Sequence, residues 1–259
     1  MPIVRDVDTF LKDRFLFSGN NIILENNELP SIQVLRRCFS LSVASDWFSD
    51  KEYDFTAVEL EKNCPVPAGC QSMPLRSFFW EKKQNPEITS KAARARCLLN
   101  FRSEFRYCSC CGGALKDDDV LTARVCVQCG RPVFPKLEPA VIVLVQKENK
   151  ILLARHKNRN DNVFSCIAGF VEAGEKIEET VSREVMEETG IKVCNVRYVG
   201  SQAWPYPDQL MLAFVCDWQE GEIVIQEDEL VEAAWFDRTN LPKIPSPGSV
   251  AYNLIAGLF

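Results

Sequence analysis

The sequence predicts an α+β fold with a C-terminal α/β/α sandwich domain, preceded by a four-cysteine ribbon and a smaller α+β N-terminal domain. Strand-like segments lie on both sides of one amphipathic segment at residues 169–191, and two Cys-x2-Cys pairs precede them. The N-terminal third contains short alternating segments between turn-forming residues. We expect an N-terminal domain at 1–106, a ribbon at 107–135 and the sandwich domain at 136–259.

Length and composition are those of an ordinary globular protein. The 259 residues suffice for one large or two ordinary domains, and 46% hydrophobic with 25% charged residues are common values. No apolar run is long enough for a membrane span, and the N-terminus lacks the apolar core of a signal peptide. We therefore expect a cytoplasmic protein with no membrane partner.

The net charge and the histidine content argue against broad nucleic-acid binding and against Ser-His-Asp catalysis. The formal net charge of −6 argues against a broad electrostatic grip on nucleic acid. Bound cations would still let an acidic protein act on an anionic substrate. His156 is the only histidine. It follows the strand-like KILLAR, with no nucleophile motif nearby, so Ser-His-Asp catalysis is not expected.

The N-terminal domain gives the fewest functional clues. NNIILENNELP and YDFTAVELE predict short strands in hairpins, and RSFFW at 76–80 predicts either another strand or the start of a helix. KAARARCLLNFRSEF predicts a linker helix with Ser90 as its N-cap. The basic residues of this helix are expected to keep one face solvated; they are Lys91, Arg94 and Arg102.

Four cysteines form a metal-binding pattern. Fourteen residues separate the pair Cys108 and Cys111 from the pair Cys126 and Cys129. Two such knuckles joined by a hairpin bind Zn²⁺ through four thiolates, which leaves no position for a catalytic water. We predict a structural zinc site. Cys110 is out of register and could compete with Cys111, but Gly112 after Cys111 favours the register with Cys111. The alternative is four unligated thiols. The other cysteines are expected to be reduced and mostly buried: Cys38, Cys64, Cys70, Cys97, Cys110, Cys166, Cys194 and Cys216.

The C-terminal domain is predicted from its strands. AVIVLVQ and KILLAR flank KEN and predict a hairpin. Four further strands are expected at VRYVGSQ, LMLAFVCDW, EIVIQ and VEAAWF, and a short helix at SVAYNLIAGLF. Between these strands lies GFVEAGEKIEETVSREVMEETGI, residues 169–191. Ile177, Val181 and Val185 form one apolar stripe of a helix that ends at Gly190.

This helix concentrates carboxylates. Glu184 and Glu188 are one turn apart on the same face, Glu187 lies beside them, and Arg183 is placed to contact Glu187. Such a cluster repels itself unless a cation neutralises it, and Mg²⁺ or Mn²⁺ prefers all-oxygen ligands and phosphate-bearing substrates. The alternative is a solvated acidic face. Against that alternative, the segment matches G-x5-E-x7-R-E-hydrophobic-x-E-E-x-G-hydrophobic at every position. By this signature the chain resembles the Nudix hydrolases.

A second motif narrows the resemblance. SQAWPYP at 201–207 presents Trp204 and Tyr206 on a proline-stiffened loop, where an aromatic side chain can stack on a base or only pack on the core. A four-cysteine ribbon, then the signature segment at 169–191, then this motif is an order that resembles the NADH pyrophosphatase subfamily. In that subfamily the motif reads SQPWPFP. Ala203 and Tyr206 depart from that form, and Gln209 stands where serine is common. The preferred nucleotide therefore stays open.

The resemblance implies specific roles and partners. It implies a divalent cation held by Glu184, Glu188, Glu229 and the Ala168 carbonyl, and catalysis by Glu184, Glu187, Glu188 and Glu229. It implies zinc at Cys108, Cys111, Cys126 and Cys129. It implies substrate contacts at Phe170, Gln202, Ala203, Trp204, Pro205, Tyr206, Pro207, Asp208, Gln209, Phe134, Arg76 and Ala251. Phe170 and Trp204 would sandwich the base, with Trp204 supplied by the second subunit of a homodimer.

The implied reaction is hydrolysis of the pyrophosphate bond of NADH or NAD to nicotinamide mononucleotide and AMP. The resemblance also implies removal of NAD caps from RNA 5′ ends. Two alternatives stay open. One is a Nudix pyrophosphatase acting on ADP-ribose or dinucleoside polyphosphates, and the other is a non-catalytic nucleotide-sensing regulator. A regulator would not need every carboxylate of the signature at 169–191, and this sequence retains all of them.

Overall fold

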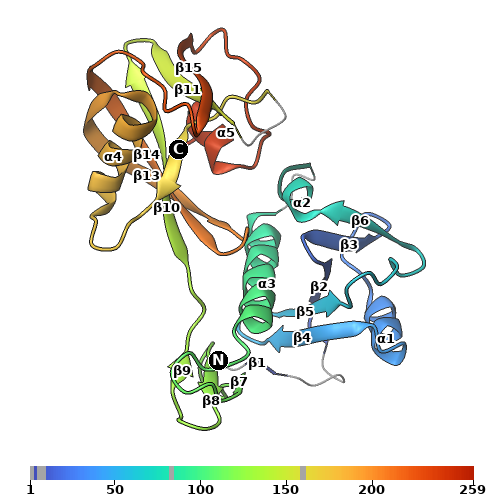
Figure 1. Ribbon diagram of the computed structural model, residues 1–259. Coiled ribbons are helices and arrows are strands. Elements are labelled where there is room, and N and C mark those ends of the chain that lie inside the picture. Colours follow the sequence, from blue (N-terminus) through green and yellow to red (C-terminus); the bar gives the residue numbers. More distant parts are fainter. Residues whose placement is uncertain (1–2, 5–9, 82–84, 158–161) are drawn as a thin grey trace. The chain divides into compact units, whose positions relative to one another are not determined.

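The computed structural model describes all residues except 1–2, 5–9, 82–84 and 158–161 (Figure 1). The chain forms two compact units. The first contains Met1–Lys136 and Pro205–Asp208, and the second contains Leu137–Trp204 and Gln209–Phe259. The division into three domains expected from the sequence stays a prediction. Within the described ranges, no helix combines the length and apolar character that crossing a membrane would require.

The first unit is built on a mixed sheet whose strands follow the order β1-β4-β5-β2-β3-β6. These strands are β1 (Ile3–Val4), β2 (Asp13–Ser18), β3 (Asn21–Glu25), β4 (Ala44–Asp50), β5 (Phe55–Leu60) and β6 (Cys70–Pro74). Its helices are α1 (Ile32–Ser40), α2 (Leu75–Glu81) and α3 (Pro86–Glu104). The segment at 76–80 is therefore helical. The strands predicted within NNIILENNELP and YDFTAVELE are confirmed as β3 and β5, and β3 forms its hairpin with β2.

Helix α3 starts earlier than the sequence suggested. The side chain of Asn85 accepts a hydrogen bond from the Glu87 N–H at 2.9 Å, and Pro86 occupies the first helical position. The prediction of Ser90 as N-cap is therefore wrong. Asn-Pro is a stronger start signal than a serine inside the helix, because proline is pre-shaped for the first turn.

The basic residues of α3 are also not solvated. Arg102 is only 4% exposed and donates to Asp46 at 2.7 Å and to Asp117 at 2.6 Å. Lys91 and Arg94 likewise pair with carboxylates, on Asp13 and Asp50 respectively. The apolar side of the helix packs on β2 and β5. Helix α3 is thus a core element of the first unit, and its interpretation as a solvated linker helix is wrong.

The ribbon is a small three-stranded sheet in the first unit. Its strands, in spatial order, are β7 (Leu115–Asp117), β8 (Arg124–Cys126) and β9 (Pro132–Val133). Its core is correspondingly small and consists of Cys108, Leu115 and Cys126, with Phe105 and Val133 beside them. So few buried side chains supply little stability, and a bound metal is the usual supplement in a fold of this size.

The second unit is a sheet of order β13-β14-β10-β11-β15, with β12 paired to β10. Its elements are β10 (Glu138–Lys147), β11 (Lys150–His156), β12 (Ile167–Phe170), α4 (Ile177–Thr189), β13 (Lys192–Trp204), β14 (Gln209–Glu220), β15 (Leu230–Asp237) and α5 (Val250–Ile255). The predicted hairpin of β10 and β11, the position of His156 at a strand end, and the C-terminal helix are confirmed.

Strand β10 is buried on both faces. Val141 and Val143 pack on the side of α4, and Ile142 and Leu144 pack on the side of α5 (Figure 1). Alternate side chains therefore join two different cores, which explains the nearly continuous apolar run in the sequence. The result is the predicted α/β/α sandwich.

The segment EIVIQ at 222–226 is not a strand, contrary to expectation. Its backbone bonds to the end of α4 instead: the Val224 N–H donates to the Thr189 carbonyl at 2.9 Å, and the Gln226 N–H to the Glu188 carbonyl at 3.0 Å. These carbonyls have no partner within the helix, so an extended segment satisfies them as well as a ladder would. Alternating apolar residues do not distinguish the two cases.

Candidate active site

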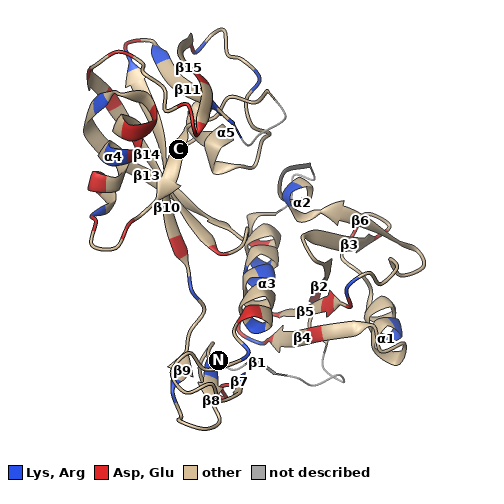
Figure 2. Cartoon of the chain, viewed as in Figure 1, with Lys and Arg blue, Asp and Glu red and all other residues tan. Residues whose placement is uncertain are grey.

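Helix α4 forms because its apolar stripe is buried and its end is capped. Val181 and Val185 are fully buried against the sheet, and Gly190 adopts the left-handed conformation with φ of 69°. The same periodicity turns Glu184 and Glu188 inward, since they lie one residue away from the stripe. Both are buried. Figure 2 shows the acidic positions along this helix.

Strand β12 fits against the Glu184 side chain. A Cβ atom added to Gly169 would lie 2.0 Å from the carboxyl carbon of Glu184. Any side chain at this position would force the Glu184 carboxylate to move, so the first glycine of the signature leaves space for the carboxylate in this conformation. Ala168, whose carbonyl is a predicted cation ligand, precedes it on β12 and pairs with Ile142 of β10.

Arg183 organises the acidic residues around it. Its guanidinium donates to both carboxylate oxygens of Glu175, at 2.6 and 3.0 Å, and to the Phe170 carbonyl at 3.0 Å. It also donates to Glu184 at 2.8 Å and to Glu187 at 3.0 Å. The predicted contact between Arg183 and Glu187 is thus confirmed. One arginine therefore fixes the loop after β12 and two carboxylates of α4 at the same time.

Glu175 is part of this support. Hydrogen bonds from Arg183, then from the Thr180 hydroxyl at 2.7 Å and from the Glu172 N–H, lower the pKa of the Glu175 carboxyl to about 2. A carboxylate with all these donors has little capacity left for a cation. We therefore attribute the glutamate at this position of the signature to its hydrogen bonds, which fix the loop after β12.

Glu188 has the opposite environment. It is 1% exposed, and neither carboxylate oxygen has a hydrogen-bond partner among the described residues. Burial, followed by the charges of Glu229, Glu184 and Glu187, raises the pKa of Glu188 to about 8. A buried carboxylate without a partner is costly. A hard divalent cation is the partner that such oxygens fit best.

Glu229 lies on a turn that is hydrogen-bonded to the C-terminal end of α4. Its carbonyl accepts from the Lys157 N–H at 2.8 Å, and its N–H donates to the Gln226 carbonyl at 3.1 Å. Gln226 in turn bonds to the Glu188 carbonyl, so this turn lies against the end of the helix. The Glu229 charge contributes to the raised pKa values of both Glu184 and Glu188. The structure thus places Glu229, which is 41 positions beyond Glu188 in sequence, beside the α4 carboxylates.

The carboxylates do not converge on a single point. In the part of the chain that the structure describes, the four thiols of the ribbon are the only group of three or more candidate ligands whose atoms come within 4.8 Å of one another. Mutual repulsion keeps uncompensated carboxylates apart. The assignment of Glu184, Glu188 and Glu229 as cation ligands stays a prediction.

Gln202 joins β13 to the start of α5. Its amide donates to the Gly248 carbonyl at 2.9 Å and accepts from the Val250 N–H at 2.8 Å. Ala251 follows Val250 in the first turn of α5 and is buried. Two predicted substrate positions, Gln202 and Ala251, are thus brought together within the second unit. The structure gives the Gln202 amide two partners in the protein.

The remaining predicted contacts divide between the two units. In the second unit, Phe170 is 48% exposed, and Ala203 and Trp204 of β13 pair with Leu210 and Gln209 of β14. In the first unit, Phe134 is exposed and the Arg76 guanidinium lies 5.3 Å from the Tyr206 ring. Residues 205–208 cluster with that unit, with Pro205 and Asp208 buried and Pro207 exposed.

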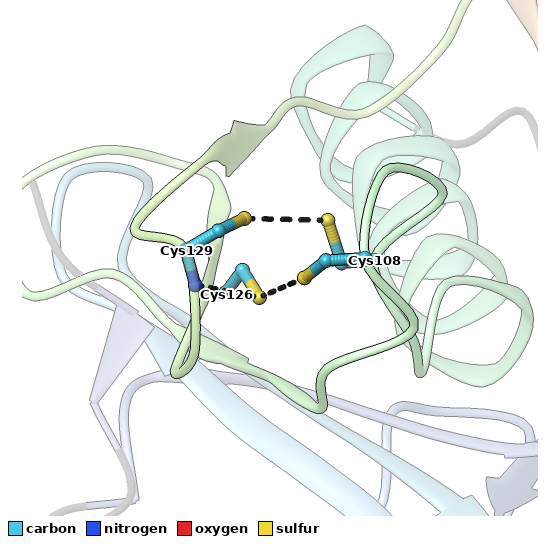
Figure 3. A group of neighbouring side chains, drawn as sticks. Cys108, Cys126 and Cys129 are labelled. Atoms are coloured by element: carbon cyan, nitrogen blue, oxygen red, sulfur yellow. Dashed lines mark hydrogen bonds between the residues drawn. The ribbon is translucent and has the colours of Figure 1, made fainter.

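The four ribbon thiols match a zinc site (Figure 3). The Sγ atoms of Cys108 and Cys129 are 3.8 Å apart, and those of Cys111 and Cys126 are 3.5 Å apart. A tetrahedron with Zn–S bonds of about 2.3 Å has sulfur–sulfur edges of about 3.8 Å. The thiols therefore already have the spacing that Zn²⁺ requires, and the predicted four-cysteine cluster is confirmed.

Backbone groups complete each knuckle. Cys110 and Gln128, two residues past Cys108 and Cys126, each donate an N–H to that sulfur at 3.4 Å. N–H donors of Cys129 and Gln128 lower the pKa of Cys126 to about 6. Gly112 and Gly130 have φ near +70°, which turns the chain back after each pair. Cys110 contributes its backbone and is itself exposed, so the predicted register is confirmed.

Sequence reasoning missed the residues that support this site. Thr180 and the Phe170 carbonyl hold Glu175 and Arg183 but belong to no motif that names a function. Asn100 donates to the Pro207 carbonyl at 3.2 Å across 107 residues. No local pattern indicates a hydrogen bond over such a separation.

Comparison with known proteins agrees with this geometry. The sandwich and the signature residues on α4 define a domain of the Nudix class, and residues 136–254 match the model of the NUDIX domain. The chain is 42% identical over 172 residues to the NAD-capped RNA hydrolase NudC of Klebsiella pneumoniae (strain 342), covering 66% of this chain and 67% of that protein. It is 43% identical over 172 residues to the protein of that name from Salmonella heidelberg (strain SL476), with the same coverage of each. The chain therefore belongs to the Nudix hydrolases, in the family of the NAD-capped RNA hydrolases NudC.

Among solved structures, the chain is similar to a NUDIX hydrolase from Nitrosomonas europaea. The match has a TM-score of 0.43 and 22% sequence identity, and it covers 53% of this chain and 80% of that one.

Proposed function

We propose that this enzyme hydrolyses the pyrophosphate bond of NADH and NAD, and that it also removes NAD caps from RNA 5′ ends. Water attacks one phosphorus of the pyrophosphate, the bridging P–O bond breaks, and the products are AMP and nicotinamide mononucleotide. Membership of the family that contains the NAD-capped RNA hydrolases supports the substrate class. The observation that carries the chemistry is the buried Glu188 carboxylate, which has no hydrogen-bond partner among the residues that the structure describes and lies among other carboxylates.

The carboxylates of Glu184, Glu188 and Glu229 would hold Mg²⁺ or Mn²⁺. Such cations lower the pKa of an attacking water and offset the charge that builds up on the phosphate oxygens. Arg183 contributes by fixing Glu184 through a hydrogen bond of 2.8 Å, and Glu175 fixes Arg183 in turn. Both contacts restrict the rotamers of Glu184 and Arg183 before substrate binds. The entropy of these side chains is therefore lost on folding and not on substrate binding.

The nucleotide-binding part of the proposal concerns aromatic side chains. Phe170 is half-exposed at the end of β12, and Arg183 donates to its carbonyl, so its ring is presented from a rigid backbone. Trp204 ends β13 and is paired with Gln209. Flat rings on fixed backbone suit stacking on a base or a nicotinamide. The homodimer in which Trp204 comes from the second subunit, and the cytoplasmic location, stay predictions.

Zinc in the ribbon is proposed to be structural. The four thiols occupy every corner of a tetrahedron, so a metal held there has no open position for substrate. The stability contributed by the metal would supplement a very small core.

The experiment that tests the proposal is a product assay on NADH with Mg²⁺ or Mn²⁺. We expect AMP and reduced nicotinamide mononucleotide in equal amounts. We also expect kcat/KM for NADH to be higher than kcat/KM for ADP-ribose. A preference for ADP-ribose or a dinucleoside polyphosphate would instead identify another Nudix pyrophosphatase. Tight nucleotide binding without any product would identify a sensing regulator. An NAD-capped RNA, with the uncapped monophosphate RNA as expected product, tests the second activity.

A further inference from the structure

The loop at Pro205–Asp208 is held by residues of the first unit. The Asn100 amide, on α3, donates to the Pro207 carbonyl at 3.2 Å. On α2, the Arg76 guanidinium lies 5.3 Å from the centre of the Tyr206 ring. Asp208 is 7% exposed. Pro205 is buried as well, so all four loop residues are buried or in contact with the N-terminal part of the chain.

Asn100 is itself held by Arg96, one helical turn earlier. The Arg96 Nε atom donates to the Asn100 side-chain oxygen at 2.9 Å. Because arginine has only donors, this contact fixes the orientation of the amide, with its oxygen toward Arg96 and its NH₂ group toward the loop. The hydrogen bond to Pro207 therefore follows from the position of Arg96.

Arg96 is anchored in the sheet of the first unit. It is 5% exposed, donates to the Gly19 carbonyl at 2.9 Å and forms an ion pair with Glu59. Its guanidinium also lies 5.2 Å from the centre of the Phe17 ring. A buried arginine with this set of partners has one conformation, since breaking any contact leaves a buried charge unsatisfied. A rigid chain of contacts thus runs from the β2–β5 region through Arg96 and Asn100 to the Pro207 carbonyl.

The held loop is the one that contains predicted substrate contacts. Pro205, Tyr206, Pro207 and Asp208 all belong to the SQAWPYP motif or follow it directly, and Pro205 is bonded to Trp204. We propose that Asn100 is a positioning residue for dinucleotide binding, which fixes this loop and so gives the N-terminal unit a part in substrate selection. This inference rests on the proposed function for its substrate.

The test compares Asn100→Asp with the wild type. Aspartate still accepts from Arg96 but has no NH₂ group, and it turns an oxygen toward the Pro207 carbonyl. Loss of one hydrogen bond of ordinary strength corresponds to about fivefold in an equilibrium. We expect hydrogen exchange at the Tyr206 and Asp208 amides to accelerate by about fivefold, KM for NADH to rise by about fivefold, and kcat to change by less than about twofold.

The control is Arg94→Ala on the same helix. Among the described residues, Arg94 contacts Asp50, Thr122 and Tyr53 and none of the loop residues. Its loss should therefore leave loop exchange and KM unchanged while removing a salt bridge. Asn100→Ala, which removes both contacts with no added charge, should reproduce the effects of Asn100→Asp. Both measurements are made on the full chain with intact zinc.

Two results would overturn the inference. Unchanged exchange at Tyr206 and Asp208 in both Asn100 variants would show that the loop is held without Asn100. Faster exchange with an unchanged KM would show that loop position does not select the substrate. A wild-type enzyme that does not hydrolyse NADH would refute the proposed function, and with it the substrate role of Asn100. The exchange measurement would still decide whether Asn100 fixes the loop.

Discussion

Arg183 and Glu175 form a two-point ion pair, with the Arg183 Nε and Nη2 atoms 2.6 and 3.0 Å from the two oxygens of Glu175. The pair joins the loop after β12 to the face of α4 that bears the inward-facing glutamates. Because Arg183 also contacts Glu184 and Glu187, the conformation of the catalytic face depends on a residue that is not itself a proposed ligand. This relationship gives the first prediction.

Glu175→Gln should lower activity by roughly 10–100-fold, the usual effect of losing a partner that orients a ligand. The control is Glu178→Gln, an exposed glutamate at the start of the same helix, which should be neutral. Steady-state kinetics on NADH would check both. Equal activity of the two variants would contradict the role of the pair.

The same pair predicts a pH dependence of folding. Contacts with Arg183 lower the pKa of Glu175 from 4.5 to about 2 in the folded protein. The resulting stabilisation is complete above pH 4.5 and is lost as the pH falls toward 2. The difference in urea midpoint between wild type and Glu175→Gln should therefore be largest above pH 4.5 and shrink below it. A difference that is independent of pH would contradict this.

Local signals explain which parts of the fold could be predicted. Helix α4, its end at Gly190 and the ribbon register follow from residue spacings of four residues or fewer, which reflect helix and knuckle geometry directly. Local sequence does not predict that Arg102 is buried, because its partner Asp46 is 56 residues away. The segment at 222–226 was misjudged because an alternating pattern also suits a chain that satisfies the end of a helix.

In the candidate site, too, local patterns are predictable and long-range contacts are not. One helical pattern identifies the glutamates of α4, but it does not predict the different surroundings of each carboxylate. Glu175 is surrounded by donors, whereas the described part of the chain offers Glu188 none, although both are glutamates of one signature. That contrast depends on which backbone N–H groups and side chains the loop brings near each carboxylate. No spacing rule contains this information.

Glu188→Gln should lower kcat by at least about 100-fold while the protein folds normally. The substitution keeps the shape of the side chain and removes one charge from the proposed cation ligands. Because neither oxygen of the wild-type group bonds to any described residue, the neutral amide should not destabilise the protein without cations. Kinetics and thermal unfolding would be measured together. Near wild-type turnover would exclude Glu188 as a cation ligand.

Gly169→Ala should destabilise the protein by about 1–3 kcal/mol, the usual cost of overpacking. The added Cβ would lie 2.0 Å from the Glu184 carboxyl carbon. In a Glu184→Ala background the same substitution should cost much less, because the clashing atoms are gone. Urea unfolding of the four proteins gives the coupling between the two positions. Additive effects would show that the carboxylate moves away freely.

Cys126→Ser should release zinc and lower the melting temperature, because ligand bonds contribute to the free energy of folding. Cys110→Ser is the matched control: this neighbouring cysteine is exposed and lies outside the four-thiol group. It should keep one zinc per chain and the wild-type melting temperature. Metal analysis and calorimetry would check both variants. Retention of zinc by Cys126→Ser would mean that the ribbon assignment is wrong.

The last prediction concerns Trp204, the residue expected to distinguish dinucleotides from other diphosphates. The signature on α4 accounts only for cleavage of a pyrophosphate, so selection must come from residues elsewhere. Stacking on a base is worth about 1–3 kcal/mol by alanine substitution, which corresponds to about fivefold to more than hundredfold in affinity. Trp204→Ala should therefore raise KM for NADH by at least about fivefold.

The effect on kcat should be much smaller, because a ring that stacks far from the phosphorus binds ground state and transition state alike. A pyrophosphate substrate with no planar group at that position serves as the control and should be nearly unaffected. Trp204 is at the end of β13, where it pairs with Gln209, so its loss leaves the sheet ladder in place. Equal losses on both substrates in a folded variant would mean that Trp204 only packs against the protein. Dinucleotide selection would then have to come from other residues, with Phe170 the first to test.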